Sequence, residues 1–395
     1  MPSPRVGFLC LVCAALLALP GAAPAAQRAP AAPAPRAPAP KEEAKPPYKS
    51  AILLEAETGR VLEEHNADEK LVPASIVKMM VMLVVAEAVG KGVHKLDEVV
   101  ITSAAASKIG GSQVYLKQGE RFTLEELLKT ISIVSANDSS HAVAEHVAGS
   151  TQAFVQLMNE RAKQLGMKNT LYHSVHGLPP GPGEEADHTT ARDTAILARE
   201  LLKHPMLLKW TSTLQDTFRG GQFGLLNTNS RLMRAFQGMD GIKTGYYDEA
   251  GFNLCATAKR GNLRLISVVL GSPKRPVRDQ ETSRLLLQGF RLYKKEVFFE
   301  KVRELEKPIP VQGSRIKATL LKPEAAVSVL VKRLEAPQAK TRLKFSNPLQ
   351  APQAKGQKVG EIEAVVGNEV IAKTALVATE EVPKLTLLER LMFWK

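Results

Sequence analysis

The sequence predicts a mixed α/β (α+β) domain, in which helices flank an antiparallel sheet, and a small all-β domain that follows it. Two apolar-rich runs of strand length stand near residue 50, and three more follow residue 240, with helical periodicity between them. After about residue 300, short alternating segments separated by Pro, Gly and charged residues replace the helical pattern. The 395 residues are enough for two or three domains.

Residues 1–26 have the pattern of a secretory signal peptide. Arg5 precedes an apolar stretch from Val6 to Leu19, and small residues follow at positions 22, 23, 25 and 26. The apolar stretch is too short to span a bilayer comfortably, which favours cleavage over a retained anchor. Cleavage would remove Cys10 and Cys13 and leave Cys255 without a partner for an internal disulfide. We therefore expect an exported chain that is stabilised by its core.

Residues 27–47 are dominated by Ala and Pro, a composition that favours an extended, semi-rigid linker. Folded structure is expected from Tyr48. The runs Ser50–Glu55 and Val61–His65 are typical of two strands joined as a hairpin. Pro73 then opens a helical pattern, with apolar residues at three- and four-residue spacing, that ends at Gly90.

The first domain is expected over residues 48–298. Thr123 and Glu126 form a capping-box signature at the start of a second helix. Further helices are expected at about 140–147, 152–165, 191–202 and 279–293, and strands at 241–245, 252–259 and 263–270. Strands from both ends of this region are expected to meet in one mainly antiparallel sheet.

The second domain is expected over residues 299–382, with short strands near 315–320, 327–331, 343–345 and 365–370. Residues 383–395 combine apolar and basic side chains, namely Leu385, Leu388, Leu391, Met392, Phe393 and Trp394 with Lys384, Arg390 and Lys395. This pattern predicts an amphipathic C-terminal helix that lies on a membrane surface as an anchor. The alternative is a helix packed on the protein body.

The formal net charge is +13 and the pI is near 9.5. Such a balance suits an anionic partner, which could be nucleic acid, membrane headgroups or an acidic wall polymer. The sequence contains no Cys/His zinc pattern or Gly-rich phosphate loop that would favour nucleic acid. We therefore expect no nucleic-acid partner.

The first motif with catalytic potential is Ser75-Ile76-Val77-Lys78. Positions i and i+3 lie on one face of a helix, so the hydroxyl and the amine can approach each other. Pro73 places Ser75 in the first helical turn, where free N–H groups favour an anionic intermediate. A serine needs a neighbouring base, and lysine serves as one only if its pKa falls. A lone Ser-x-x-Lys occurs by chance in a chain of this size.

The second motif is Ser135-Ala136-Asn137, which follows the apolar end of the helix that begins at Thr123. A hydroxyl and an amide here could relay a proton to a leaving amine and orient a carbonyl. Ser and Asn are also common where helices end, so this motif alone carries little weight.

The third motif is Lys243-Thr244-Gly245, on the strand that starts with Asp240-Gly241. Lys243 would supply a second positive charge that lowers the pKa of Lys78. Thr244 could bind a substrate carboxylate, and Gly245 would let a substrate backbone lie along the strand edge.

The three motifs occur in order, on a helix start, a loop after a helix, and a strand, as in β-lactamases and penicillin-binding proteins. From Tyr48 to Val382 the chain resembles the low-molecular-mass penicillin-binding proteins that act as serine-type D-alanyl-D-alanine carboxypeptidases. Supporting stretches are 73–79, His176-Gly177-Leu178, Thr190-Ala191-Arg192-Asp193 and 240–245. The β domain is matched by position and composition.

This resemblance implies acyl transfer on the terminal D-Ala-D-Ala of peptidoglycan stem peptides, with β-lactam antibiotics as acylating inhibitors and no cofactor or metal. Ser75 would attack the carbonyl while Lys78 takes its proton, and Ser135 and Lys243 would assist departure of D-alanine. The backbone N–H groups of Ser75 and Tyr246 would hold the oxyanion. The resemblance also implies a periplasmic location or the outer face of the cytoplasmic membrane.

Tyr246 departs from the family pattern, in which a histidine often follows the third motif. Because only its backbone is needed for the oxyanion, the departure concerns substrate preference. Some relatives use an arginine for the terminal carboxylate; Arg231 and Arg234 are candidates, each also typical of a plain surface residue.

Several alternatives share these residues. A β-lactamase needs a deacylating carboxylate, for which Glu184 and Glu185 have no supporting pattern. An endopeptidase that cuts peptide cross-links would differ only in substrate access, and a non-enzymatic wall-binding scaffold would carry a degenerate site. A zinc peptidase would need paired histidines with a carboxylate. The pairs at 173 and 176 and at 141 and 146 lack the surrounding pattern and are typical of structural histidines.

Overall fold

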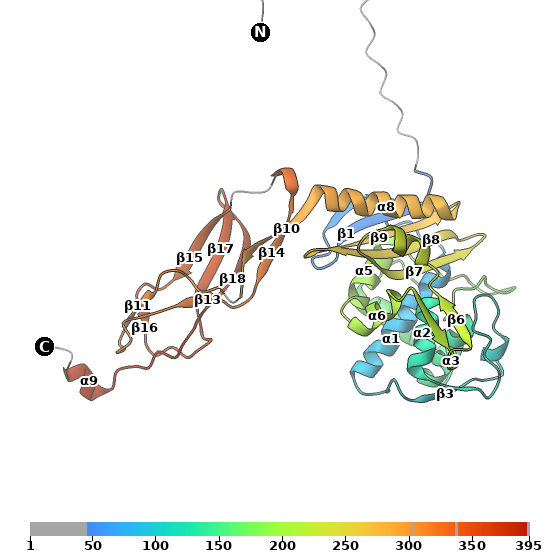
Figure 1. Cartoon of the computed structure of the whole chain (residues 1–395), viewed down its shortest axis with the longest axis horizontal. Coiled ribbons are helices and arrows are strands. Elements are labelled where there is room, and N and C mark those ends of the chain that lie inside the picture. The colour runs from blue at the N-terminus through green and yellow to red at the C-terminus, as the bar shows by residue number, and fades with distance from the viewer. Residues whose placement is uncertain (1–45, 302, 336–338, 393–395) are drawn as a thin grey trace, which may run out of the picture. The chain divides into compact units, whose positions relative to one another are not determined.

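The computed structural model describes residues 46–301, 303–335 and 339–392 (Figure 1). The expected signal peptide, nearly all of the linker and the last three residues of the expected anchor lie outside these residues. Within the described part, no helix has the length and apolar character needed to cross a membrane.

The first domain is built on a five-stranded sheet in the order β2-β1-β9-β8-β7, in which every neighbouring pair is antiparallel. Its strands are β1 (Ser50–Glu55), β2 (Val61–His65), β7 (Met239–Tyr247), β8 (Gly251–Arg260) and β9 (Leu263–Ser272). The prediction that strands from both ends of the domain meet in one sheet is therefore confirmed.

The sheet is buried on both faces. Along β1, Ile52 and Leu54 join one core cluster whereas Ala51 and Leu53 join the other, as strand alternation requires. Helix α8 (Arg275–Leu292) contacts β8 and β9 and contributes Leu285 and Leu286 to the second cluster. In Figure 1, α8 lies on one side of the sheet and most of the other helices of this domain lie on the other side.

The helix block contains α1 (Lys78–Gly90), α2 (Leu124–Ile133), α3 (Asn137–Ala148), α4 (Thr151–Leu165), α5 (Ala191–Leu201), α6 (Pro205–Thr211) and α7 (Ser230–Ala235), with short 3₁₀ turns η1 (Ala74–Val77) and η2 (Ala106–Lys108). The expected helices are confirmed with small shifts at their ends. Thr123 and Glu126 form the expected capping box at the start of α2. Helix α1 is buried over most of its surface, which is why it is apolar on nearly all sides.

Two short antiparallel strand pairs were not anticipated: β3 (Val99–Ile101) pairs with β4 (Arg121–Thr123), and β5 (Gln215–Phe218) pairs with β6 (Phe223–Leu226). Each strand has only three or four residues and carries exposed positions. Such short segments give too little periodicity to stand out in the sequence.

The second domain is all β apart from a short 3₁₀ turn, η3 (Arg333–Glu335). It contains the pair β10 (Tyr293–Phe299) and β14 (Val327–Lys332), and the sheet β12 (Ala318–Thr319), β11 (Ile309–Gln312), β16 (Leu349–Gln350). A third sheet has the order β13 (Leu321–Pro323), β18 (Glu369–Ala378), β17 (Lys358–Val366), β15 (Lys340–Phe345). Leu321, Ile362 and Leu376 belong to its core.

The expected single strand at 365–370 is wrong: the end of β17 and the start of β18 pair here, as Val365 with Val370 and Val366 with Glu369. Gly367, with φ of 58°, lies in the tight turn that joins the two strands. After β18 the chain ends its described part in α9 (Leu387–Met392).

Candidate active site

Ser75 lies in η1 and Lys78 begins α1, so the expected helix start is a tight 3₁₀ turn that leads into the α-helix. Lys78 Nζ donates to Ser75 Oγ at 2.9 Å and to the backbone carbonyl of His176 at 2.7 Å. The Ser75 hydroxyl also lies 3.5 Å from that carbonyl. The spacing of three residues therefore brings hydroxyl and amine together as predicted.

The environment of Lys78 favours its neutral form. The side chain is fully buried, and this burial lowers the pKa of Lys78 well below its usual value. The positive charge of Lys243 lowers the pKa further, while the carboxylates of Asp187 and Asp138 oppose the shift. A neutral amine 2.9 Å from Ser75 Oγ can accept the proton of the hydroxyl.

Lys243 and Thr244 lie on β7, the terminal strand of the sheet order. Lys243 is 1% exposed, and burial together with the charge of Arg278 lowers its pKa to about 7. Its Nζ donates to the Thr244 carbonyl at 3.0 Å, and Thr244 Oγ1 donates to Thr228 Oγ1 at 2.8 Å. The strand thus brings a second buried amine near Lys78, at an edge of the sheet that no other strand of the described residues covers.

Gly245 has a role that the sequence did not suggest. A Cβ atom at this position would lie 2.5 Å from the carbonyl oxygen of Pro73 and 3.2 Å from the backbone nitrogen of Ile76. The absence of a side chain lets β7 contact the turn that carries Ser75. The next residue, Tyr246, is 52% exposed and stacks on Phe252 with ring centroids 4.1 Å apart.

Ser135 and Asn137 follow α2 as predicted, and both are buried. Ser135 has a φ of 64°, an uncommon conformation for a residue other than glycine. Asn137 Nδ2 donates to the carbonyl of Gly110 at 2.7 Å. Ser135 Oγ and Asn137 Oδ1 make no hydrogen bond with described residues. Buried polar atoms left without partners are costly, and they are typical of positions where a ligand supplies the partner.

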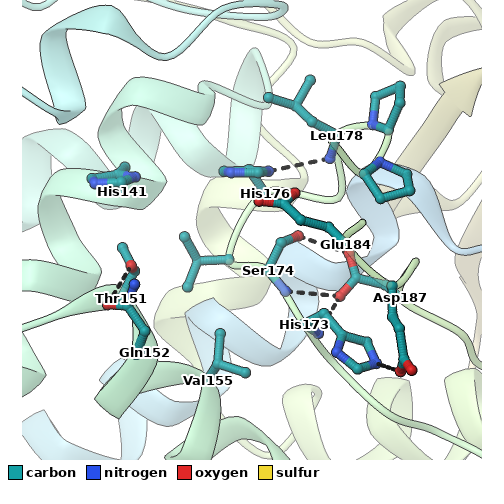
Figure 2. A pocket seen from close by; sticks show the side chains of 14 residues that line it. His141, Thr151, Gln152, Val155, His173, Ser174, His176, Leu178, Glu184 and Asp187 are labelled. Atoms are coloured by element: carbon teal, nitrogen blue, oxygen red, sulfur yellow. Dashed lines mark hydrogen bonds and ion pairs between the residues drawn. The ribbon is translucent and has the colours of Figure 1, made fainter. Parts of the chain in front are cut away.

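Asp187 holds the segment that carries the His176 carbonyl, the acceptor of the Lys78 hydrogen bond (Figure 2). The Asp187 carboxylate accepts from the backbone N–H groups of His173 at 2.6 Å and Ser174 at 3.0 Å, and from Ser174 Oγ–H at 2.7 Å. Ser174 Oγ in turn accepts from Gly177 N–H at 2.8 Å. Gly177 lies directly against the Ser75 turn, because a Cβ there would lie 2.1 Å from the Ala74 carbonyl oxygen.

On its other side, the segment of residues 173–187 lines a cavity of about 360 Å³ against α3 and α4. Figure 2 shows the His141 and Thr151 side chains across this cavity from His176. Glu185 is 80% exposed and pairs with His173, and the Glu184 carboxylate accepts from Gly181 N–H at 2.8 Å. Glu184 and Glu185, the two candidates for the deacylating carboxylate of a β-lactamase, therefore both make contacts within this segment.

Sequence reasoning missed three residues near the site. Asp187 had no motif around it. Asn253 Nδ2 donates to the carbonyls of Val72 at 2.9 Å and Pro73 at 3.1 Å, and thereby ties β8 to the segment before Ser75. Arg278 is 3% exposed and acts electrostatically on Lys243.

The two arginines considered for the substrate carboxylate, Arg231 and Arg234, lie exposed on α7. The sequence predicted this helix from about residue 279, whereas α8 starts at Arg275. Arg278 therefore lay outside the expected helix and was not considered for the site.

Two family models together match most of the chain. A family model described as D-alanyl-D-alanine carboxypeptidase matches residues 37–274, and one described as penicillin-binding protein 5, C-terminal domain, matches residues 282–384. The chain is 39% identical to D-alanyl-D-alanine carboxypeptidase DacF of Bacillus subtilis, over 87% of this chain and 89% of the relative. It is 35% identical to DacC of Escherichia coli, over 84% and 83% of the two chains.

Among solved structures, penicillin-binding protein 5 of Haemophilus influenzae superposes with a TM-score of 0.68 at 29% identity, covering 86% of this chain and 99% of that one. The fold and the pairing of Ser75 with Lys78 are those of a serine hydrolase. Within that class, the chain belongs to the D-alanyl-D-alanine carboxypeptidase family.

Proposed function

We propose that this chain is a serine D-alanyl-D-alanine carboxypeptidase that removes the terminal D-alanine from peptidoglycan stem pentapeptides and is inhibited by penicillin. The observation that carries the proposal is the hydrogen bond from Lys78 Nζ to Ser75 Oγ in a site that also holds the buried amine of Lys243. Family membership supports the reaction class.

The proposed reaction has two steps. Ser75 Oγ bonds to the carbonyl carbon of the penultimate D-alanine, its proton passes to Lys78 Nζ, and the oxyanion is held by the N–H groups of Ser75 and Tyr246. The amide C–N bond breaks, and the departing amine of D-alanine takes a proton with the help of Ser135 and Lys243. Water then hydrolyses the ester and restores the Ser75 hydroxyl.

The remaining site residues bind the substrate in this proposal. The unpartnered Asn137 Oδ1 is available to accept from a substrate amide. Thr244 and Lys243 provide a hydroxyl and a positive charge for the terminal carboxylate, and the edge of β7 at Gly245 accepts the substrate backbone. The buried guanidinium of Arg278, rather than Arg231 or Arg234, adds to the positive potential at Lys243.

The test is to incubate the purified protein and a Ser75→Ala variant with fluorescent penicillin and, separately, with a peptide that ends in D-Ala-D-Ala. We expect a stable adduct and release of D-alanine from the unmodified protein, and neither from the variant. Rapid penicillin turnover without D-alanine release would favour a β-lactamase. Cleavage of cross-linked dimers alone would favour an endopeptidase, and absence of any adduct would favour a scaffold.

We further propose that the chain is exported and held on the outer face of the cytoplasmic membrane by residues 383–395. The sequence pattern of residues 1–26 supports export. Leu387 and Leu388 of α9 are 80% and 77% exposed, which leaves an apolar surface for a lipid interface. A chain lacking residues 383–395 should leave the membrane fraction and keep its activity on soluble peptide. Continued sedimentation with membranes would refute the anchor.

A further inference from the structure

Two histidines converge on one carboxylate oxygen at a place that the proposed reaction does not use. His94 Nδ1 lies 2.9 Å and His146 Nε2 lies 3.0 Å from Glu98 Oε2. These three atoms all lie within 4.8 Å of one another. Because both rings contact the same oxygen, the three side chains form one cluster and not two separate pairs.

The three residues come from different parts of the helix block. His94 lies in the turn that follows α1, Glu98 directly precedes β3, and His146 is in the last turn of α3. Figure 1 shows α1, α3 and β3 in the same part of the first domain, and α3 contacts both α1 and β3. The cluster therefore joins the segment between α1 and β3, which holds His94 and Glu98, to the distant end of α3.

The set of donor atoms is the one that zinc prefers. Two imidazole nitrogens and one carboxylate oxygen match three-ligand zinc sites, in which the fourth position holds water. With Zn–N and Zn–O distances of about 2.0–2.2 Å, tetrahedral ligand atoms lie roughly 3.4 Å apart. The observed contacts of 2.9 and 3.0 Å would open by a few tenths of an ångström to admit the ion.

The surroundings hold the ligands in place and leave access for an ion. Glu98 Oε1 accepts from the backbone N–H of Lys95 at 2.8 Å, which fixes the carboxylate and leaves Oε2 for the histidines. The side chains of His94, Glu98 and His146 are 17%, 30% and 25% exposed, so the cluster is partly shielded but open to solvent. The C-terminal end of α3, where His146 lies, also favours a positive charge.

We propose that His94, Glu98 and His146 form a binding site for a divalent transition-metal ion of the zinc class. In this site, each histidine coordinates through the nitrogen that now faces Glu98 and keeps its proton on the other ring nitrogen. The ion ties the segment after α1 to β3 and α3. Lys78 and Asn137 begin the two helices, and the 13 residues of α1 span roughly 20 Å, so the ion stabilises the domain without touching the reacting atoms.

The test is calorimetric titration of the untagged full chain, stripped with chelator, with Zn²⁺ and with Co²⁺. We expect one equivalent of each to bind, visible Co²⁺ absorption of a low-coordinate site, and a rise in the unfolding midpoint with Zn²⁺. The variants His94→Gln and His146→Gln should each weaken Zn²⁺ binding at least about 100-fold. Loss of a residue that only supports a metal ligand already lowers metal affinity by about 10–100-fold. His94 lies in a turn, so its variant should fold normally.

The matched control is His141→Gln. His141 also faces a glutamate four residues away, Glu145, at 3.3 Å, but within the described part of the chain no second histidine joins this pair. This variant should keep the affinity of the unmodified chain. The proposal is overturned if no Zn²⁺ binds at millimolar concentration, if excess Mg²⁺ displaces it, or if His94→Gln and His146→Gln leave the affinity unchanged. None of these readouts depends on peptidase activity.

Discussion

Lys78 Nζ donates to Ser75 Oγ at 2.9 Å, and both side chains belong to one continuous stretch of 3₁₀ and α-helix. The distance alone does not make lysine a base. Its burial, with the second amine of Lys243 nearby, lowers the pKa of Lys78 and so favours the neutral amine. The chemistry of the site therefore depends on residues that β7 and the 173–187 segment bring to this pair.

The variant Lys243→Gln tests the electrostatic coupling. Removing a like charge raises the pKa of Lys78, so its amine becomes protonated at a higher pH. Acylation requires the neutral amine and falls as the pH falls through this pKa. We therefore expect the acidic limb of the acylation rate to move to higher pH, measured with fluorescent penicillin between pH 5 and 9. Unchanged limb position, with a reduced plateau only, would contradict the coupling.

The variant Asp187→Asn should move the same limb in the opposite direction. The Asp187 carboxylate raises the pKa of Lys78, so its removal lowers that pKa further and shifts the acidic limb to lower pH. An amide cannot accept all three donors of His173 and Ser174, so the free energy of unfolding should fall by about 2–3 kcal/mol.

The control for Asp187→Asn is Glu185→Gln in the same segment. Glu185 is 80% exposed and pairs with His173. Chemical denaturation and the pH profile of this variant should match those of the unmodified chain. Equal effects of the two variants would argue against a positioning role for Asp187.

The variant Ser135→Ala should separate activity from stability. Ser135 Oγ is buried without a partner among the described residues, so removing the hydroxyl should leave the free energy of unfolding unchanged or raise it by up to about 1 kcal/mol. If the hydroxyl passes a proton to the leaving amine, D-alanine release should fall by about 10²–10⁴-fold.

Ser139→Ala, in the helix α3 that follows Ser135, is the opposite control, in which stability should change and turnover should not. Ser139 Oγ accepts from Thr130 Oγ1 at 2.7 Å, so its loss should cost about 1 kcal/mol of stability with little effect on turnover. A Ser135→Ala variant that loses stability and keeps D-alanine release would remove Ser135 from the mechanism.

The sequence predicted the motif residues because their chemistry is local: three-residue spacing sets Ser75 beside Lys78, and a capping box marks the start of α2. It could not predict the acceptor for Lys78, since this is a backbone carbonyl 98 positions away. Asp187 acts on that backbone through hydrogen bonds, which leave no pattern in the sequence. The expected single strand at 365–370 is wrong because a tight turn at Gly367 divides these residues between two paired strands.

The same distinction applies to the histidines. The sequence spacing suggested His141 and His146 as a pair. In the fold, His146 contacts Glu98 instead, and the ring centroids of His146 and His94 lie 5.7 Å apart. His141 instead faces Glu145 on its own helix. Contacts between elements that are distant in the sequence are fixed by packing, which sequence spacing does not report.

Gly177 offers the sharpest steric test of how the 173–187 segment supports Ser75. Gly177 has a φ of 73°, and a Cβ there would lie 2.1 Å from the Ala74 carbonyl oxygen. Gly183 in the same segment has a φ of 83° and open space where its Cβ would lie. Alanine at either site strains the backbone by about 1–2 kcal/mol, but only at Gly177 must the Ser75 turn also move.

We therefore expect Gly177→Ala to lose at least about 2 kcal/mol more stability than Gly183→Ala. We also expect its acylation by fluorescent penicillin to slow at least about 100-fold, since a shift of about 1 Å in a reacting group has that effect. Thermal denaturation and acylation rates of the two variants, measured side by side, decide the matter. Equal losses would mean that the backbone strain alone accounts for the effect and that Gly177 does not position the nucleophile.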